Sequence, residues 1–326
     1  MHHQSQQGAA PDQLPDSFSA PLADHQAFEI KGPDTDRFLQ GQVTCDIQEL
    51  TTGTSLPGAA CNPKGRAYAL FRLLRVAEDR VMMRVPASIA DDVSNQLDKY
   101  LAFFKAQMTR ADDWSLTGIV GAEAASSLSG MDRVPDACND VESTDRGFLI
   151  AVPPLPDGTP RFELWQRGDP VATGQASLPV EAWRLSEIHS GLITLSSATV
   201  GAYIPLNLNL HAINGVSFQK GCYTGQEVIA RMHHLGQLKK SLFRLTASFL
   251  DSTPAVGDPL VDADGSKLGE ITDCVATEGG NCEMLAVLSH KAMERSITLA
   301  DQPAACISLA PMGYRVPEQQ EVIDNL

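Results

Sequence analysis

Residues 217–227 read SFQKGCYTGQE. Thr224 and Glu227 have the T-x-x-E spacing of a capping box, so a helix is predicted to begin near Thr224. Cys222 lies two residues earlier, where a thiolate would face free backbone N–H groups and the positive end of the helix dipole. Lys220 would add a nearby cation. Because both effects lower the pKa of a thiol, the stretch favours a nucleophile or metal ligand over a small buried cysteine in a tight turn.

The composition is that of an ordinary globular protein. The chain has 326 residues, of which 43% are hydrophobic and 20% charged, and it is long enough for two or three domains. The net charge of −15 gives a surface that repels phosphate backbones, so strong direct nucleic-acid binding is not expected.

The seven cysteines include no C-x-x-C pair and match neither a zinc nor a ferredoxin spacing. No permanent metal is therefore predicted, and unpaired cysteines indicate a reducing compartment. Residues 1–21 lack the apolar core of a secretory signal and the arginine-rich pattern of a mitochondrial one, and no apolar run reaches the roughly 18 residues of a membrane span. A cytoplasmic protein without a membrane partner is expected.

Apolar periodicity up to residue 240 predicts a mixture of helices and strands. A stripe of apolar residues with helical spacing predicts a helix over 86–107. Glycine and proline residues mark the turns and helix starts that delimit the other elements. Further helices are expected from about 33 to 43, over 121–128 and over 179–191, and strands over 27–30, 67–76, 81–85, 114–120, 148–152 and 161–166.

From Ser241 onward the pattern changes to short strands. These are expected over 242–250, 260–263, 267–276 and 283–289, with turn signals at Asp264-Gly265 and Gly279-Gly280-Asn281. Repeated short strands with such turns are typical of a small barrel. The predicted domains are a flexible tail (1–20), a mixed region (21–240), a β-barrel (241–316) and a second tail (317–326).

The segment KGCYTGQE (220–227) resembles the signature of the YgfZ family, folate-binding relatives of the T-protein (aminomethyltransferase) of the glycine cleavage system. Three more blocks match in the family's order: FLQGQ at 38–42, the helix at 179–191 and GAYIP at 201–205. The matches run from about Gly32 to Leu288. The resemblance implies an α+β fold, a T-protein-like cloverleaf of two intertwined α+β lobes plus a C-terminal small β-barrel.

Members of this family look like tetrahydrofolate-binding proteins that support iron–sulfur enzymes, including enzymes that modify tRNA. The resemblance implies that Cys222 is the functional thiol and a transient iron–sulfur ligand, because one cysteine cannot supply the four ligands of a stable cluster. The implied functional motif comprises Lys220, Gly221, Cys222, Tyr223, Thr224, Gly225, Gln226, Glu227 and Arg231.

The same resemblance suggests which residues contact tetrahydrofolate or a derivative. Trp183, on the matching helix, is either a stacking partner for the pterin or an ordinary core tryptophan. His25 stands near the position where the family has another aromatic residue, and histidine can also stack. The remaining expected contacts are Tyr203, Gln40 and Gln42.

A folate-dependent aminomethyl transferase is the alternative. The T-protein carries a pair of acidic residues on the strand after the Lys-Gly turn, whereas residues 64–71 contain no carboxylate. Since general acid–base catalysis needs a titratable group near the substrate, a conventional enzyme is not expected. A thiol enzyme without folate and a direct tRNA-modifying enzyme stay open. The expected partners are reduced folate, iron–sulfur client enzymes and assembly factors.

Overall fold

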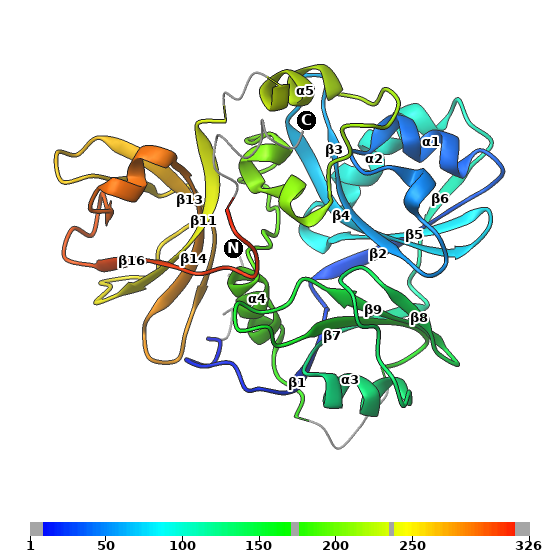
Figure 1. The fold of residues 1–326 in the computed structure, drawn as a ribbon, viewed down its shortest axis with the longest axis horizontal. Helices are drawn as coiled ribbons and strands as arrows, with labels where there is room; N and C mark the ends of the chain where they lie inside the picture. The colour runs from blue at the N-terminus through cyan, green and yellow to red at the C-terminus, as the bar shows by residue number, and fades with distance from the viewer. Residues whose placement is uncertain (1–8, 171–175, 235–237, 317–326) are drawn as a thin grey trace, which may run out of the picture.

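The computed structural model describes residues 9–170, 176–234 and 238–316. Three lobes, each built on an antiparallel sheet, meet around a central group of short helices (Figure 1). This arrangement confirms the predicted α+β class.

The first lobe contains a five-stranded sheet in the order β3-β4-β5-β2-β6. Its strands are β2 (His25–Lys31), β3 (Ser55–Cys61), β4 (Ala67–Ala77), β5 (Arg80–Pro86) and β6 (Gln107–Arg110). The helical elements of this part are α1 (Thr35–Gln42), η1 (Ile47–Glu49), η2 (Ala87–Ile89) and α2 (Ala90–Leu101). Apolar residues on β2, β4, α1 and α2 point into one shared core.

The predicted helix over 86–107 is too long. Helix α2 ends at Leu101, and Gln107–Arg110 pair with β2 as the edge strand β6. Phe104 turns back onto Phe38, with ring centroids 5.5 Å apart in an edge-to-face arrangement. Packing of these two rings stabilises the turn that follows α2, where the predicted helix would have continued.

The second lobe has the strand order β1-β7-β10-β9-β8. Its elements are β1 (Phe18–Pro21), β7 (Trp114–Val120), α3 (Ala122–Ser129), β8 (Val141–Ser143), β9 (Gly147–Val152) and β10 (Arg161–Arg167). The end of the tail predicted over 1–20 belongs to this sheet, because β1 pairs with β7 and Phe18 is fully buried in the lobe's core. That prediction is wrong at its C-terminal boundary.

The third lobe is a curled six-stranded sheet in the order β15-β12-β13-β14-β11-β16. It comprises β11 (Lys240–Ser248), β12 (Pro259–Val261), β13 (Lys267–Ala276), β14 (Cys282–Ser289), η5 (His290–Glu294), β15 (Thr298–Leu299) and β16 (Cys306–Ala310). Irregular register on β12 and β13 helps the sheet curl. The predicted small barrel is confirmed, whereas the tail over 317–326 lies outside the described residues.

The segment between the second sheet and the barrel returns to the centre of the molecule. It contains α4 (Val180–His189), η3 (Pro205–Leu208), η4 (Leu210–Ile213) and α5 (Gln226–His234). Helix α4 packs against β1, β13 and β14. It therefore contacts both the second lobe and the barrel, whereas α5 lies beside β3 at the top of Figure 1.

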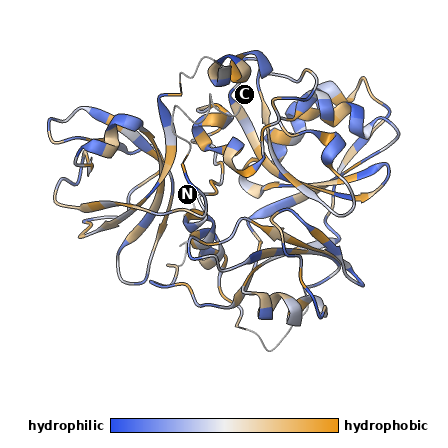
Figure 2. Cartoon of the chain, in the orientation of Figure 1, coloured by the Kyte–Doolittle hydropathy of each residue, from blue (hydrophilic) through white to orange (hydrophobic). Residues whose placement is uncertain are grey.

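Hydrophobic stretches run along the strands of all three lobes in Figure 2, in line with their buried cores. Among the described residues, no helix is long and apolar enough to cross a membrane.

Candidate functional site

The segment 217–225 joins η4 to α5 and lies against the end of α1. Backbone N–H groups of Ser217 and Thr224 donate to the carbonyls of Thr44 and Gly41, at 2.8 and 3.1 Å. The Thr224 hydroxyl donates to Gln42 Oε1 at 3.5 Å. The two sequence blocks 38–42 and 220–227, far apart in the chain, are therefore in contact.

Lys220 anchors this loop rather than standing free beside the thiol. Its side chain is buried, and Nζ donates to the carbonyls of Val43 and Cys45, each at 2.7 Å. The ammonium also lies 5.1 Å from the Tyr223 ring centroid. Burial lowers the pKa of Lys220 to about 8. The expected cation for Cys222 is corrected to a structural tether, because two carbonyls engage the ammonium.

Glycines bring the loop against the turn between β3 and β4. Gly225 has φ +88°, and a Cβ there would lie 2.7 Å from the Asn62 carbonyl oxygen and 3.0 Å from Gly65 Cα. Gly65 has φ +70°, and a Cβ on it would lie 2.9 Å from Val228 Cβ. Both the backbone conformation and the close approach favour glycine at these two positions.

Helix α5 begins at Gln226, two residues later than the capping-box prediction. The positive φ of Gly225 interrupts the helical path. Thr224 bonds to α1, and the Gln226 side chain accepts the N–H of Tyr223 at 3.3 Å instead. Cys222 thus lies four residues before the helix. This weakens the helix-dipole argument, because the dipole acts mainly within the first turn.

Cys222 is exposed, in contrast to two cysteines near the loop. Cys45 and Cys61 are buried, and burial raises the pKa of each thiol to about 12. Glu227 and Arg231 form an exposed ion pair at 3.2 Å on the following helix. In the described ranges, no group of three or more His, Cys, Asp or Glu side chains can hold a metal. The accessible thiol of this loop is Cys222.

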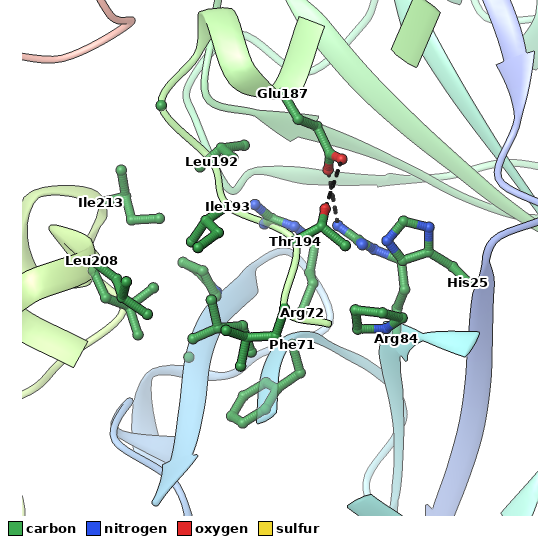
Figure 3. Close-up of a pocket in the computed structure, with 17 residues that line it drawn as sticks. His25, Phe71, Arg72, Arg84, Glu187, Leu192, Ile193, Thr194, Leu208 and Ile213 are labelled. Atoms are coloured by element: carbon green, nitrogen blue, oxygen red, sulfur yellow. Dashed lines mark hydrogen bonds and ion pairs between the residues drawn. The ribbon is translucent and has the colours of Figure 1, made fainter. Parts of the chain in front are cut away.

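A central cavity lies between the first sheet, α4 and the segment 191–195 (Figure 3), with about 620 Å³ of atom-free space including its mouth. Polar lining is provided by His25, Arg72, Arg84, Glu187 and Thr194. The other lining residues are apolar or glycine: Pro57, Gly58, Leu70, Phe71, Pro86, Gly191, Leu192, Ile193, Leu195, Leu208, Leu210 and Ile213. This mixture suits a largely apolar ligand with a few polar groups.

The polar end of the cavity contains a buried carboxylate. Glu187 Oε1 lies 3.9 Å from Arg84 Nη2, and Thr194 Oγ1 donates to Glu187 Oε2 at 3.5 Å (Figure 3). Arg84 also pairs with Glu163 at 2.7 Å. Burial alone would raise the pKa of Glu163, but Arg84 and Arg72 outweigh it and hold that pKa below its ordinary value. The arginines therefore stabilise negative charge at this end of the cavity.

The predicted folate contacts fall in different places. His25 lines the cavity, with Nδ1 2.8 Å from Asp24 Oδ1. Gln42 contacts the Cys222 loop, whereas Gln40 bonds to Asp46 Oδ1 and the N–H of Ile47, each at 2.8 Å. Gln40 therefore stabilises the local fold.

Tyr203 links the first lobe to the barrel. Its hydroxyl donates to Glu270 of β13, and its carbonyl accepts the N–H of Ala67. The polar end of this side chain is thus directed at β13.

Trp183 is a core residue, so its expected stacking on a pterin is corrected. The side chain is fully buried in the second-lobe core, and its ring lies 4.1 Å from the Arg161 guanidinium carbon. A Cβ on Gly118 would approach the ring to 2.3 Å. The close fit to this glycine leaves no room for a ligand ring on that face.

Sequence reasoning missed Arg72, Arg84 and Glu187. The available signals were single charges within apolar segments: Arg72 interrupts a hydrophobic strand, and Glu187 lies four residues after Trp183 on the buried side of α4. Charged residues at such positions are rare unless they are paired.

The loop and the cavity share a wall. Lys220 bonds to the carbonyl of Cys45, and Cys45 Sγ lies 2.9 Å from where a Cβ on Gly58 would be. Gly58 and its neighbour Phe71 line the cavity. A ligand in the cavity would thus lie one packing layer from the tether of the Cys222 loop.

Comparisons with known proteins agree with this architecture. Residues 22–143 match the family model for the GCVT N-terminal domain. The chain is 30% identical to the tRNA-modifying protein YgfZ of Colwellia psychrerythraea over 312 residues, which cover 93% of this chain and 94% of that protein. It is also 30% identical to the tRNA-modifying protein YgfZ of Klebsiella pneumoniae, over 91% of this chain and 93% of the relative.

A solved structure supports the same fold. The glycine cleavage system aminomethyltransferase T from Bartonella henselae aligns with a TM-score of 0.68 at 15% identity, over 94% of this chain and 88% of that one. Such low identity bears on fold alone. Together with the full-length relatives, it confirms the resemblance first recognised at residues 220–227: the chain belongs to the YgfZ family and has the fold of aminomethyltransferase T.

Proposed function

We propose that this protein is a tetrahydrofolate-binding accessory protein for tRNA modification. It supports the assembly or repair of iron–sulfur enzymes, with Cys222 as its functional thiol. The names of the YgfZ relatives support the link to tRNA modification. The proposal makes the tRNA effect indirect, in keeping with a net charge of −15.

The central cavity is the observation that carries the folate part. A pterin ring has parallel N–H donors on one edge, and a carboxylate accepts such a pair in bidentate fashion. Glu187 supplies a carboxylate, while Leu208 and Ile193 provide apolar surface for the ring. A largely apolar lining with a few polar groups is typical of small-molecule sites.

The exposed thiol supports the second part. Cys222 is accessible to a partner protein, and its loop is held by the buried Lys220 beside the cavity wall. A single thiol suits transient ligation of iron or sulfur rather than a resident cluster.

Calorimetric titration with tetrahydrofolate tests the cavity. Glu187→Gln removes the negative charge but keeps the shape, and should weaken binding at least about tenfold by loss of charge-assisted hydrogen bonds. Glu181→Gln, on the same helix outside the cavity, is the matched control. Equal affinity of wild type and Glu187→Gln would contradict the proposed binding mode.

Complementation tests the thiol. A strain lacking the gene receives the wild type, Cys222→Ala or Cys138→Ala at equal protein levels; Cys138 is an exposed cysteine in the second lobe. Methylthio-modified tRNA and the activity of one unrelated iron–sulfur enzyme are measured. We expect rescue of both by wild type and Cys138→Ala only. Full rescue by Cys222→Ala would remove the thiol mechanism.

A folate-dependent one-carbon transferase is the second candidate, favoured by one observation. Although β4 contributes only Leu70, Phe71 and Arg72 to the cavity, α4 contributes the Glu187 carboxylate, and a carboxylate near the substrate is the kind of group that acid–base catalysis requires. Turnover of an aminomethyl donor that is lost in Glu187→Gln would favour this function. Folate binding without turnover would favour the accessory role.

A further inference from the structure

A second groove lies between the first and second lobes, away from Cys222. It is formed by Val76 and Arg80 around the β4–β5 turn, and by residues 143–148 with Trp114 and Arg167 from the second sheet. Its atom-free space is about 870 Å³, open mouth included. Figure 1 places β8 and β9 in the lower lobe and α5 at the top of the molecule.

Two aromatic side chains form one surface of this groove. Trp114 and Phe148 are half-buried at the edge of the second-lobe core, with ring centroids 6.2 Å apart and planes within 9° of parallel. They flank β10, where Trp114 pairs with Arg167 and Phe148 with Trp165. Nearly parallel, partly accessible rings on a rigid sheet suit stacking with a flat heterocycle.

Three arginines surround the rings: Arg80, Arg146 and Arg167. With Asp145 as the acidic lining residue, the charged lining side chains sum to +2, that is, three positive charges less one negative. Two acidic partners outside this lining, Glu29 of Arg80 and Asp113 of Arg167, offset that charge, so the arginine groove, as we call this site, offers guanidinium groups in ion pairs rather than a net positive field.

Backbone contacts orient one of these arginines in advance. Arg146 Nη2 donates to the carbonyls of Arg167 and Asp169 at 2.7 and 3.1 Å. Fixing a guanidinium in this way reduces the entropy lost when it binds an anion.

The other two arginines can accept a new anionic partner. Arg167 lies 5.3 Å over the Trp114 ring and pairs with Asp113 at 3.3 Å, but both members of that pair are more than half exposed (56% and 64%). Exposed pairs are weak, so a phosphate can compete. Arg80 Nε is buried and forms an ion pair with Glu29 Oε2 at 3.6 Å, while 38% of the arginine side chain is exposed to an incoming anion.

We propose that the arginine groove binds a nucleotide. The base stacks on Trp114 and Phe148, and the arginines bind the phosphate through charge-assisted hydrogen bonds. This site is separate from the folate cavity and goes beyond the proposed function. Recognition of a single nucleotide at one groove needs no extended basic surface, which is compatible with the chain's net charge of −15. The nucleotide is either free or an unpaired residue of an RNA.

Tryptophan fluorescence provides a direct test on the full chain. The protein has three tryptophans, and Trp165 and Trp183 are fully buried, whereas Trp114 is partly accessible. Titration with adenosine and guanosine monophosphates, and with a single-stranded adenosine tetranucleotide, should quench the emission. Quenching by the monophosphates indicates a free nucleotide as ligand, and quenching by the tetranucleotide alone indicates an RNA source. Absence of binding for all of them overturns the proposal.

A charge-reversing substitution in the arginine groove tests whether the nucleotide binds there. Arg167→Glu should weaken nucleotide binding at least about tenfold, as expected for the loss of one charge-assisted contact. Arg133→Glu changes net charge equally at another exposed arginine of the second lobe, whose side chain is 84% exposed, and should leave binding within about twofold. Equal binding by wild type and Arg167→Glu overturns the proposal, as does displacement of the nucleotide by saturating tetrahydrofolate.

Discussion

Replacing the buried Lys220 by methionine tests whether this ammonium tethers the Cys222 loop. Lys220 Nζ donates to two carbonyls at 2.7 Å. Methionine keeps much of the chain length but loses both hydrogen bonds, each worth about 1.5–3 kcal/mol for a charged donor. Relief of ammonium burial offsets part of this loss. We therefore expect Lys220→Met to lower the free energy of unfolding by about 1–3 kcal/mol near neutral pH.

The pH dependence of the free energy of unfolding tests whether the buried ammonium of Lys220 causes this difference. Burial lowers the pKa of Lys220 from 10.5 to about 8 in the folded protein. Between these values the unfolded chain binds more protons than the folded one, so the wild type becomes more stable as pH rises. Between about pH 7.5 and about pH 9.5, the two pKa values predict that the free energy of unfolding of the wild type rises by about 2 kcal/mol relative to that of Lys220→Met.

Urea unfolding of both proteins under reducing conditions measures this difference. Lys99→Met, which removes an exposed lysine from α2, sets the baseline for loss of a surface charge. If the stability difference between wild type and Lys220→Met stays constant within about 0.5 kcal/mol over this pH range, the buried-ammonium argument is refuted.

Three further predictions concern the loop and the core. Gly225→Ala should lower the free energy of unfolding by more than about 1 kcal/mol, because of its positive φ and close backbone approach, whereas Gly221→Ala, with nothing within 4 Å of the added Cβ, should be nearly neutral by the same urea assay. Alkylation followed by mass spectrometry should label Cys222 in the folded protein but protect Cys45. Trp183→Phe should lower the melting temperature yet retain tetrahydrofolate affinity within about threefold, since Trp183 packs in the core.

Each of these has a contrary outcome. Equal stability of the two glycine variants would contradict the close packing of the loop on the β3–β4 turn. Rapid labelling of Cys45 in folded protein would contradict its burial. A large loss of folate affinity in Trp183→Phe, with the fold intact by circular dichroism, would restore the stacking role.

Local patterns predicted most of the regular elements. Strands β7 and β13 were expected with their observed bounds, and α4 within two residues, because alternating or helical apolar spacing reports one buried face directly. The errors arose where a distant partner decided the outcome. Helix α2 ends early because Phe104 packs on Phe38, and β1 exists because β7 offers it a free edge.

In the candidate site, too, local sequence patterns predicted some features and contacts between distant residues decided the others. The sequence by itself determined the family, the class of fold and the prominence of Cys222, since these depend on contiguous motifs and local periodicity. Only the tertiary structure decided what the charged and aromatic side chains do. It turned Lys220 toward the carbonyls of Val43 and Cys45 just after α1, buried Trp183 and brought Arg84 of β5 beside Glu187 of α4. Those contacts join residues distant in the chain, and their energies depend on burial and separation, which no local pattern encodes.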